Sequence, residues 1–280
     1  MHFRTHRHAL AGATLALGSM LASHAVLAQQ DWPNRAIRFV VPYPPGTSGD
    51  LIARQIGPYL SKGLNGQQIV VDNRGGAGGN IGTQAVAKSA PDGYTIGFGT
   101  SGALTVNVTL LPRLPYDPLK DFAPISMMVT NPIALTIHPS LPPQNLRDFL
   151  VWAKTQPGKL SFGTAGTGTA MHLSGEVLKQ MTGIDILHVP YKGSNPAAVD
   201  LMGGQIPLAV LDLAAGRTHI RAGRIRALGV TSAQRSPVAP EIPTMAGVHR
   251  CTIAPGKPRP LAELRHPVAN ATDGGPQLPR

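Results

Sequence analysis

Two short turns rich in glycine and hydroxyl side chains each follow a strand-like run and open a helix-like one. The first turn covers residues 44–50, between the apolar run 37–41 and a periodic apolar stretch at 51–60. The second covers residues 163–169, between 160–162 and a periodic stretch that reaches 181. A helix N-terminus leaves up to four backbone N–H groups unpaired and carries about half a positive charge. Two such ends, far apart in the sequence, predict the two sides of one binding site for a small anion.

Strand-like and helix-like segments alternate through the body of the chain, which is the pattern of an α/β fold. We expect strands at 37–41, 68–71, 94–99, 122–128, 133–137, 160–162, 184–189, 206–211 and 225–231. We expect helices at 50–62, 80–89, 145–155, 170–181, 196–202 and 213–222. Asn131-Pro132 is interpreted as the crossover between a first lobe, 29–130, and a second lobe, 131–247.

The two ends of the chain differ from its body. Residues 1–28 combine the basic Arg4 and Arg7 with a small-residue apolar stretch and a cleavage-like sequence at 26–28, which is typical of a secretory signal peptide. We therefore expect export to the periplasm. Residues 248–280 are rich in Pro and Gly without sustained periodicity, so we expect a divergent, disordered tail. This tail holds Cys251, the chain's single cysteine, so the body offers neither a disulfide nor a thiolate ligand.

Composition and motif spacing argue against several functions. The formal net charge of +11 is scattered, and an aromatic content of 5% is too low for a stacking platform, so nucleic-acid binding is not expected. A G-x-G-x-x-G beginning at Gly76 fails because Ile81 occupies its last glycine position. Residues 163–168 have P-loop spacing, but Thr169 and Ala170 stand where Lys and Ser/Thr are needed. No paired-histidine motif is present outside the signal, so we expect neither cofactor nor metal.

Single polar residues near strand ends leave alternatives open. Ser101 lies at the C-terminal end of a predicted strand, where open α/β sheets bind ligands, but a turn serine explains it equally well. Asp212 could receive a ligand ammonium or a water, or it could cap the helix that follows. His172 could touch a ligand or serve packing, and Lys192 could be a counter-charge or a solvated lysine.

Many ordered blocks between about residues 32 and 247 resemble the periplasmic substrate-binding proteins of tripartite tricarboxylate transporters. The matching blocks are Trp32-Pro33, 37–46, 71–82, 90–95, 114–118, 121–124, 157–160, 188–193, 228–232 and 235–237. The resemblance implies a type II periplasmic binding-protein (Venus flytrap) fold of two α/β lobes with the ligand cleft between them. It also implies a monomer that is not an enzyme and that delivers a small organic carboxylate to membrane permease subunits.

The resemblance also suggests which residues hold the ligand. In this family the carboxylate is held mainly by backbone amides and hydroxyls of the first two turns. Carried onto matching positions, this implicates Tyr43, Gly46, Thr47 and Ser48 in the first lobe. In the second lobe it implicates Thr164, Gly166, Thr167, Gly168 and Thr169, with Ser101 and Asp212 at the rim of the cleft.

The C-terminal part departs from the family pattern. After residues 243–247 the family continues with a hinge strand and a long helical return to the first lobe, where this chain has its unpatterned tail. We interpret the difference as a reading-frame shift near codon 248, which leaves the return incomplete and exposes apolar surface on the first lobe. Two alternative functions stay open: an exported hydrolase with Ser101 or Ser48 as nucleophile, and a truncated binding protein without function.

Overall fold

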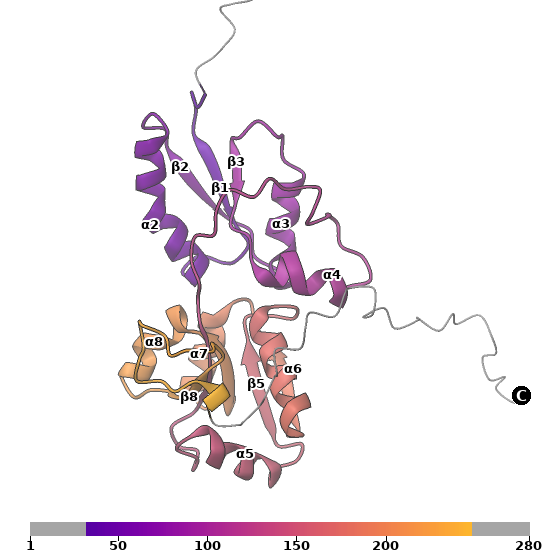
Figure 1. Ribbon diagram of the computed structural model, residues 1–280, viewed down its shortest axis with the longest axis vertical. Helices are drawn as coiled ribbons and strands as arrows, with labels where there is room; N and C mark the ends of the chain where they lie inside the picture. Colours follow the sequence, from indigo (N-terminus) through magenta and orange to yellow (C-terminus); the bar gives the residue numbers. More distant parts are fainter. Residues whose placement is uncertain (1–31, 248–280) are drawn as a thin grey trace, which may run out of the picture.

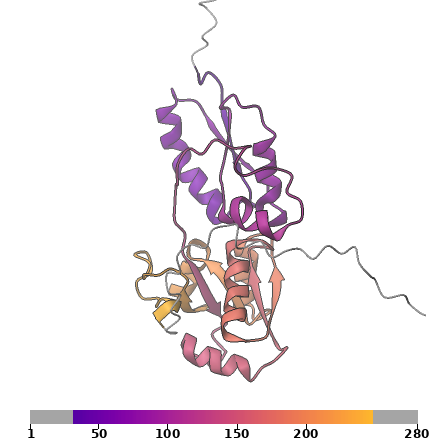
Figure 2. The ribbon, with the colours of Figure 1, turned by 45° about the vertical axis from the view of Figure 1, so that its right-hand side comes forward.

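The computed structural model describes residues 32–247, which form two α/β lobes stacked one above the other (Figure 1). The predicted signal peptide, 1–28, and the predicted tail, 248–280 with Cys251, lie outside the described residues. Within the described part, no helix combines the length and the apolar character needed to cross a bilayer. The same stacking of the two lobes is visible after a 45° turn (Figure 2).

The first lobe is built on a small parallel sheet. Its strands are β1 (Ile37–Val41), β2 (Ile69–Asn73) and β3 (Thr95–Gly97), in the order β2-β1-β3. Helices α2 (Ser48–Gly63) and α3 (Asn80–Ala87) flank this sheet, and the short η2 (Ala77–Gly79), η3 (Gly102–Val106) and α4 (Asn107–Leu110) lie toward the second lobe (Figure 1). Because all three strands are parallel, their carboxyl ends point the same way, toward the second lobe.

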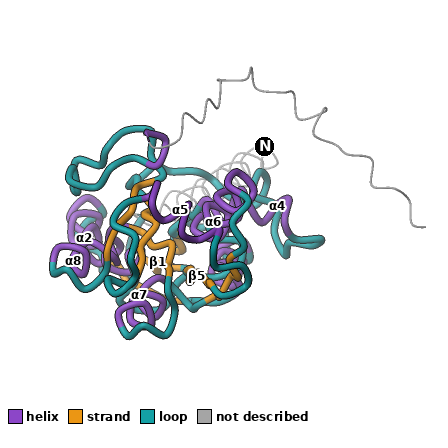
Figure 3. Tube along the Cα trace, turned by 90° about the horizontal axis from the view of Figure 1, so that it is seen from below, coloured by secondary structure: helices purple, strands orange, loops and turns teal. Residues whose placement is uncertain are grey.

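The second lobe is built on a mixed five-stranded sheet of order β6-β5-β7-β4-β8. Its strands are β4 (Ile133–Ile137), β5 (Leu160–Thr164), β6 (Ile186–Pro190), β7 (Leu208–Asp212) and β8 (Arg226–Val230), of which β4 runs antiparallel to β7 and β8. The helices are α5 (Leu146–Lys154), α6 (Ala170–Thr182), α7 (Ser194–Met202) and α8 (Leu213–Arg221), with η4 at Met245–Gly247. Seen from below, α5, α6 and α7 surround the strands (Figure 3).

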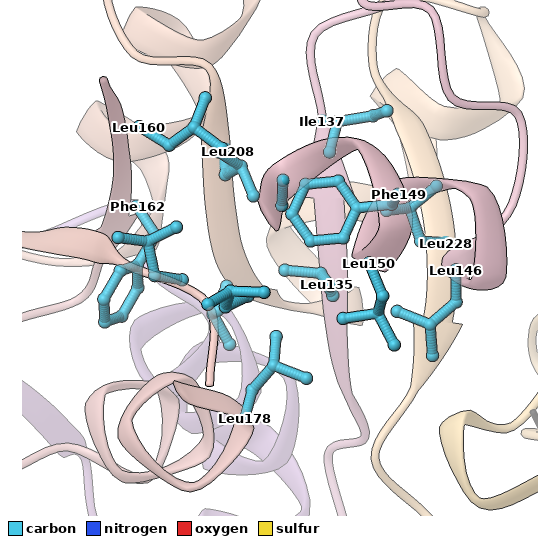
Figure 4. Close-up of a cluster of buried hydrophobic side chains, with 14 residues drawn as sticks. Leu135, Ile137, Leu146, Phe149, Leu150, Leu160, Phe162, Leu178, Leu208 and Leu228 are labelled. Carbon is cyan, nitrogen blue, oxygen red and sulfur yellow. The ribbon is translucent and has the colours of Figure 1, made fainter. Parts of the chain in front are cut away.

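The largest hydrophobic core lies between the second sheet and helices α5 and α6 (Figure 4). The predicted apolar face of α5 is buried there: Leu146, Phe149, Leu150 and Ala153 recur at the spacing of one helical face. The strands bring further apolar side chains, such as Phe162 on β5. This core fixes the ends of β5 and β7, from which the loops at the lobe junction extend.

Most predicted elements are confirmed, with shifts of at most two residues at their ends. The strands 37–41 and 133–137 are found with the predicted bounds. The strand predicted at 122–128 is wrong: these residues join no sheet, and 123–130 are exposed. The helical segment at 102–110 was not predicted. The division of the lobes at 130/131 stays a prediction, although β4 of the second sheet begins two residues later.

Candidate functional site

A cavity of about 230 Å³ lies between the two lobes. From the first lobe it is lined by Tyr43, Thr47, Ser48, Gly49, Ile52 and 98–102, and from the second by Ala165, Ala170, Met171, Gly193, Ser194 and Asp212. The segment joining the lobes contributes Val129, Asn131 and Ile133. A cavity of this size suits a small metabolite.

Three helices begin at this cavity. Helix α2 of the first lobe presents Ser48 and Gly49, while α6 and α7 of the second lobe present Ala170, Met171 and Ser194. Each helix follows a parallel strand, so its N-terminus comes to the carboxyl edge of its sheet, where open α/β sheets bind ligands. The positive ends of helix dipoles from both lobes therefore meet at one cavity.

The caps of these helices differ. On α6 the Thr169 hydroxyl accepts a hydrogen bond from the backbone N–H of His172 at 3.3 Å. The N-cap residues of α2 and α7, Thr47 and Gly193, make no such side-chain bond. The Thr47 hydroxyl instead donates to the carbonyl of Pro44 at 2.8 Å. No side chain therefore occupies the first-turn N–H groups of α2 and α7, which makes them available to an anion.

Asp212 joins the two lobes at the cavity wall. It ends β7, and its carboxylate accepts hydrogen bonds from the Ser48 hydroxyl across the junction, from the Ser194 hydroxyl at 2.6 Å and from the backbone N–H of Ala215 at 3.0 Å. The last bond confirms the N-cap alternative for Asp212 at the start of α8. The Asn195 side chain also bonds across the junction, to the carbonyl of Gly46 at 2.6 Å. Polar contacts between lobes thus surround the cavity.

Glycines allow the lobes to meet backbone to backbone beside the cavity. A Cβ on Gly102 of η3 would lie 2.8 Å from the carbonyl oxygen of Gly168 in the second lobe. A Cβ on Gly78 would collide with the carbonyl oxygen of Thr167. A smaller cavity of about 40 Å³ lies along the same junction, where the turn 76–79 faces Tyr191 and Lys192. The glycine-rich segment 75–82 therefore serves lobe contact, which the sequence alone did not reveal.

The structure brings together only part of the predicted site. Tyr43, Thr47, Ser48, Ser101 and Asp212 line the cavity. The predicted residues that do not line it are Gly46, Thr164, Gly166, Thr167, Gly168 and Thr169.

The residues outside the cavity lining shape the turns that border it. The hydroxyls of the buried Thr164 and Thr169 both donate to the carbonyl of Gly166, at 3.4 and 2.7 Å. Gly166 and Gly168 have φ values of +133° and +77°, which favour glycine. These residues set the path of the turn before α6 rather than face the cavity.

Two groups of residues that line the cavity were not predicted from the sequence. Thr100 and Ser194 add hydroxyls, and Ser194 is the last residue of a third strand-to-helix turn, 188–194, whose glycine and serine were a usable signal. The apolar wall of Ile52, Phe98, Val129, Ile133 and Met171 had no signal, because apolar residues in helices and strands normally indicate core. The site therefore combines polar groups with an apolar wall.

The electrostatics of the cavity come from one acid and several neutral groups. Asp212 is the single charged side chain of the lining, which contains no Lys, Arg or His. Burial raises the pKa of Tyr43, the Thr100 hydroxyl opposes that rise, and the charge of Asp212 adds to it, so the phenol stays neutral. Among residues 32–247, no group of three or more His, Cys, Asp or Glu side chains is placed to hold a metal ion.

A histidine pair supports the turn before α6 from outside the cavity. The rings of His172 and His188 stack with centroids 4.0 Å apart. His172 Nδ1 accepts from the backbone N–H of Gly168 at 3.2 Å, and His188 Nε2 is hydrogen-bonded to the Thr164 hydroxyl at 2.7 Å. Burial, followed by the neighbouring His172, lowers the pKa of His188 to about 4. The structure thus favours packing and turn support for His172, one of its two predicted alternatives.

Comparison with known proteins gives consistent matches. The model of the tripartite tricarboxylate transporter family receptor matches residues 52–257. The chain is 42% identical to the protein BugT of Bordetella pertussis over 223 residues, which cover 79% of this chain and 68% of BugT.

Solved structures extend this similarity to the fold. A Rhodopseudomonas palustris protein solved with adipate is 40% identical and superimposes with a TM-score of 0.75, covering 78% of this chain and 73% of its own. The periplasmic binding protein BugD is 34% identical with a TM-score of 0.74, covering 79% and 73%. These neighbours confirm the expected periplasmic binding-protein fold.

Proposed function

We propose, because the chain belongs to the family of tripartite tricarboxylate transporter receptors, that it captures a small organic carboxylate between its lobes and passes it to membrane permease subunits. Proteins of this family are periplasmic solute-binding proteins, as BugD illustrates. The observation that carries the proposal is the meeting of helix N-termini from both lobes at one cavity. In this account closure of the lobes around the ligand is the mechanism of capture.

The donors around the cavity suit a carboxylate. The first turns of α2 and α7 offer uncapped backbone N–H groups, and the Ser101 hydroxyl lies in the lining. Hydrogen bonds to a charged group contribute roughly 1.5–3 kcal/mol each. Four or five of them support binding near the micromolar level, about 8 kcal/mol, after the cost of association.

The apolar wall suits the remainder of the ligand. Ile52 and Phe98 of the first lobe and Met171 of the second line the same cavity. A hydrocarbon body placed there is removed from water, which contributes roughly 25 cal/mol per Å² of apolar surface. We therefore propose a ligand with an anionic head and a partly apolar body. The adipate of the Rhodopseudomonas palustris neighbour is one molecule with such groups.

The cavity gives less support to the hydrolase alternative. The Ser48 hydroxyl donates to Asp212, and Ser101 lies in the lining without a histidine among the lining residues. A serine nucleophile needs a general base within hydrogen-bond reach. The polar groups of this site are arranged to hold a ligand in place.

A carboxylate screen tests the proposal. The protein without its predicted signal peptide, residues 29–280, is titrated by calorimetry with mono-, di- and tricarboxylates and with amino acids. Each acid is compared with its primary amide. We expect at least one acid to bind near the micromolar level and its uncharged amide to bind at least tenfold more weakly. Equal binding of acid and amide, or turnover of simple esters that Ser101→Ala abolishes, would contradict the proposed function.

A further inference from the structure

Asp212 places a negative charge in a cavity proposed to hold an anion. Its side chain lies at the end of β7, is 4% exposed, and is the single charged group among the lining residues. None of the ion pairs within residues 32–247 includes it. A second carboxylate on the ligand at this end of the cavity would face Asp212 without a cation between them.

The hydrogen bonds of Asp212 leave it room for one further donor. An ionised carboxylate offers about four acceptor positions. Oδ1 accepts from the Ser48 hydroxyl and the Ala215 N–H, whereas Oδ2 accepts only from Ser194. The donors are neutral, so apart from the N-terminus of α8, which Asp212 caps, no positive group is paired with the carboxylate. A cationic donor on the ligand would supply both the missing hydrogen bond and the missing charge.

The position of Asp212 relative to α2 fixes where that donor belongs on the ligand. Ser48, which donates to Asp212, is also the first residue of α2, whose uncapped N–H groups are the proposed partners of the ligand carboxylate. The ligand's anionic and cationic groups must therefore be close neighbours. An α-amino acid carries them on adjacent atoms, and the wall of Ile52, Phe98 and Met171 receives an apolar side chain.

We propose that Asp212 is the specificity-determining residue of the cleft and selects neutral, apolar α-amino acids by accepting a hydrogen bond from their ammonium group. This inference rests on the proposed function, since it assigns the ligand class of the same cavity. The zwitterion places its carboxylate at the helix N-termini and its ammonium at Asp212, so the closed cavity gains no net charge. Dicarboxylates of the same length are disfavoured.

Matched ligand pairs and one charge-removing variant test this assignment. The pairs are leucine with 4-methylpentanoate, methionine with 4-(methylthio)butanoate, and phenylalanine with 3-phenylpropanoate, with adipate as the dicarboxylate. Asp212→Asn preserves the shape of the side chain, and Asn caps helices as well as Asp does. The hydroxyls of Ser48 and Ser194 can accept from the new amide, so the fold should persist. Asp185→Asn is the matched control, because Asp185 is exposed and lies outside the lining.

We expect the amino member of at least one pair to bind the wild-type chain about 10- to 100-fold more tightly than its deaminated partner. Asp212→Asn should reduce this preference to less than about threefold and strengthen adipate binding, while Asp185→Asn keeps the wild-type preference. A wild-type chain that binds the deaminated acids or adipate at least as tightly as the amino acids would overturn the inference and leave the proposed function intact. So would a preference that survives in Asp212→Asn. Failure of every carboxylate to bind would instead refute the proposed function itself.

Discussion

Gly102 of the first lobe lies against the backbone of the second lobe. Its replacement by alanine should leave the first lobe intact and disturb only the junction between the lobes. Gly102 opens η3 with a negative, helix-compatible φ, so alanine fits its backbone. In the arrangement of the lobes that the structure shows, however, the added Cβ would lie 2.8 Å from the carbonyl oxygen of Gly168 and 3.1 Å from the Cα of Thr169. Both are backbone atoms of the second lobe and cannot rotate away. Gly102→Ala should therefore oppose closure specifically.

The size of the effect follows from the separation that the lobes need. Ordinary van der Waals contact begins near 3.4 Å, so the closed junction must widen from 2.8 Å by several tenths of an ångström. Overpacking of this size costs about 1–3 kcal/mol. Because the ligand must supply that energy on closure, its apparent affinity should fall by about 5- to 150-fold. Calorimetry with the tightest carboxylate of the screen measures the loss, and small-angle scattering measures ligand-induced compaction.

Gly63→Ala is the matched control for this prediction. Gly63 lies in a helix of the same lobe, at the end of α2, and an added Cβ would meet nothing within 4 Å. The control should bind and compact like the wild type. Wild-type affinity and compaction in Gly102→Ala, with circular dichroism showing both variants folded, would refute the argument that the backbone junction forms in the bound state.

Three further predictions concern stability. Phe149→Ala removes a buried ring from the largest hydrophobic core, in the second lobe, and should lower the free energy of unfolding by about 3–5 kcal/mol in urea titrations. A loss below about 1 kcal/mol would contradict the packing described. Asn145→Ala removes the cap that accepts from the N–H of Asp148 and should cost about 1 kcal/mol, whereas Asn145→Ser, which keeps a capping oxygen, should cost less. The pKa of His188, lowered to about 4 chiefly by burial, means that the unfolded chain takes up a proton near pH 6.5 and the folded chain near pH 4. Its contribution to stability should therefore be complete above pH 6.5 and be lost as the pH falls toward 4, and His188→Gln should flatten this decline.

The regular elements of the fold were largely predictable from the sequence. The apolar face of α5 follows from residues at helical spacing, and the strands 37–41 and 133–137 from apolar runs between turn signals. The failed strand at 122–128 has a physical reason. Its apolar residues, including Ile125 and Met127, satisfy a strand pattern, but no strand within residues 32–247 pairs with them. A sequence window reports local preference and says nothing of whether a partner strand is present.

The candidate site was predictable where it depends on local turns and not where it depends on long-range contact. The turn before α2 supplied Thr47 and Ser48 because glycine and hydroxyls before an apolar-periodic run indicate a helix start. The bond from Ser48 to Asp212 joins residues 164 positions apart, which no local pattern reveals. The same signal also selected Thr164, Gly166, Gly168 and Thr169, which are not among the lining residues and complete the turn itself.

One substitution pair tests directly whether backbone N–H groups of opposed helix ends hold the anion. Ser48 is the first residue of α2, where proline is tolerated, and the preceding Thr47 is already extended with φ −76° and ψ 165°, as a residue before proline should be. Ser48→Ala removes the hydroxyl, whereas Ser48→Pro removes the hydroxyl and the N–H. Calorimetry on both variants should show that proline weakens carboxylate binding at least tenfold beyond alanine, with similar melting temperatures. Equal affinities in the two variants would contradict the account, because the helix end would then contribute nothing to holding the ligand.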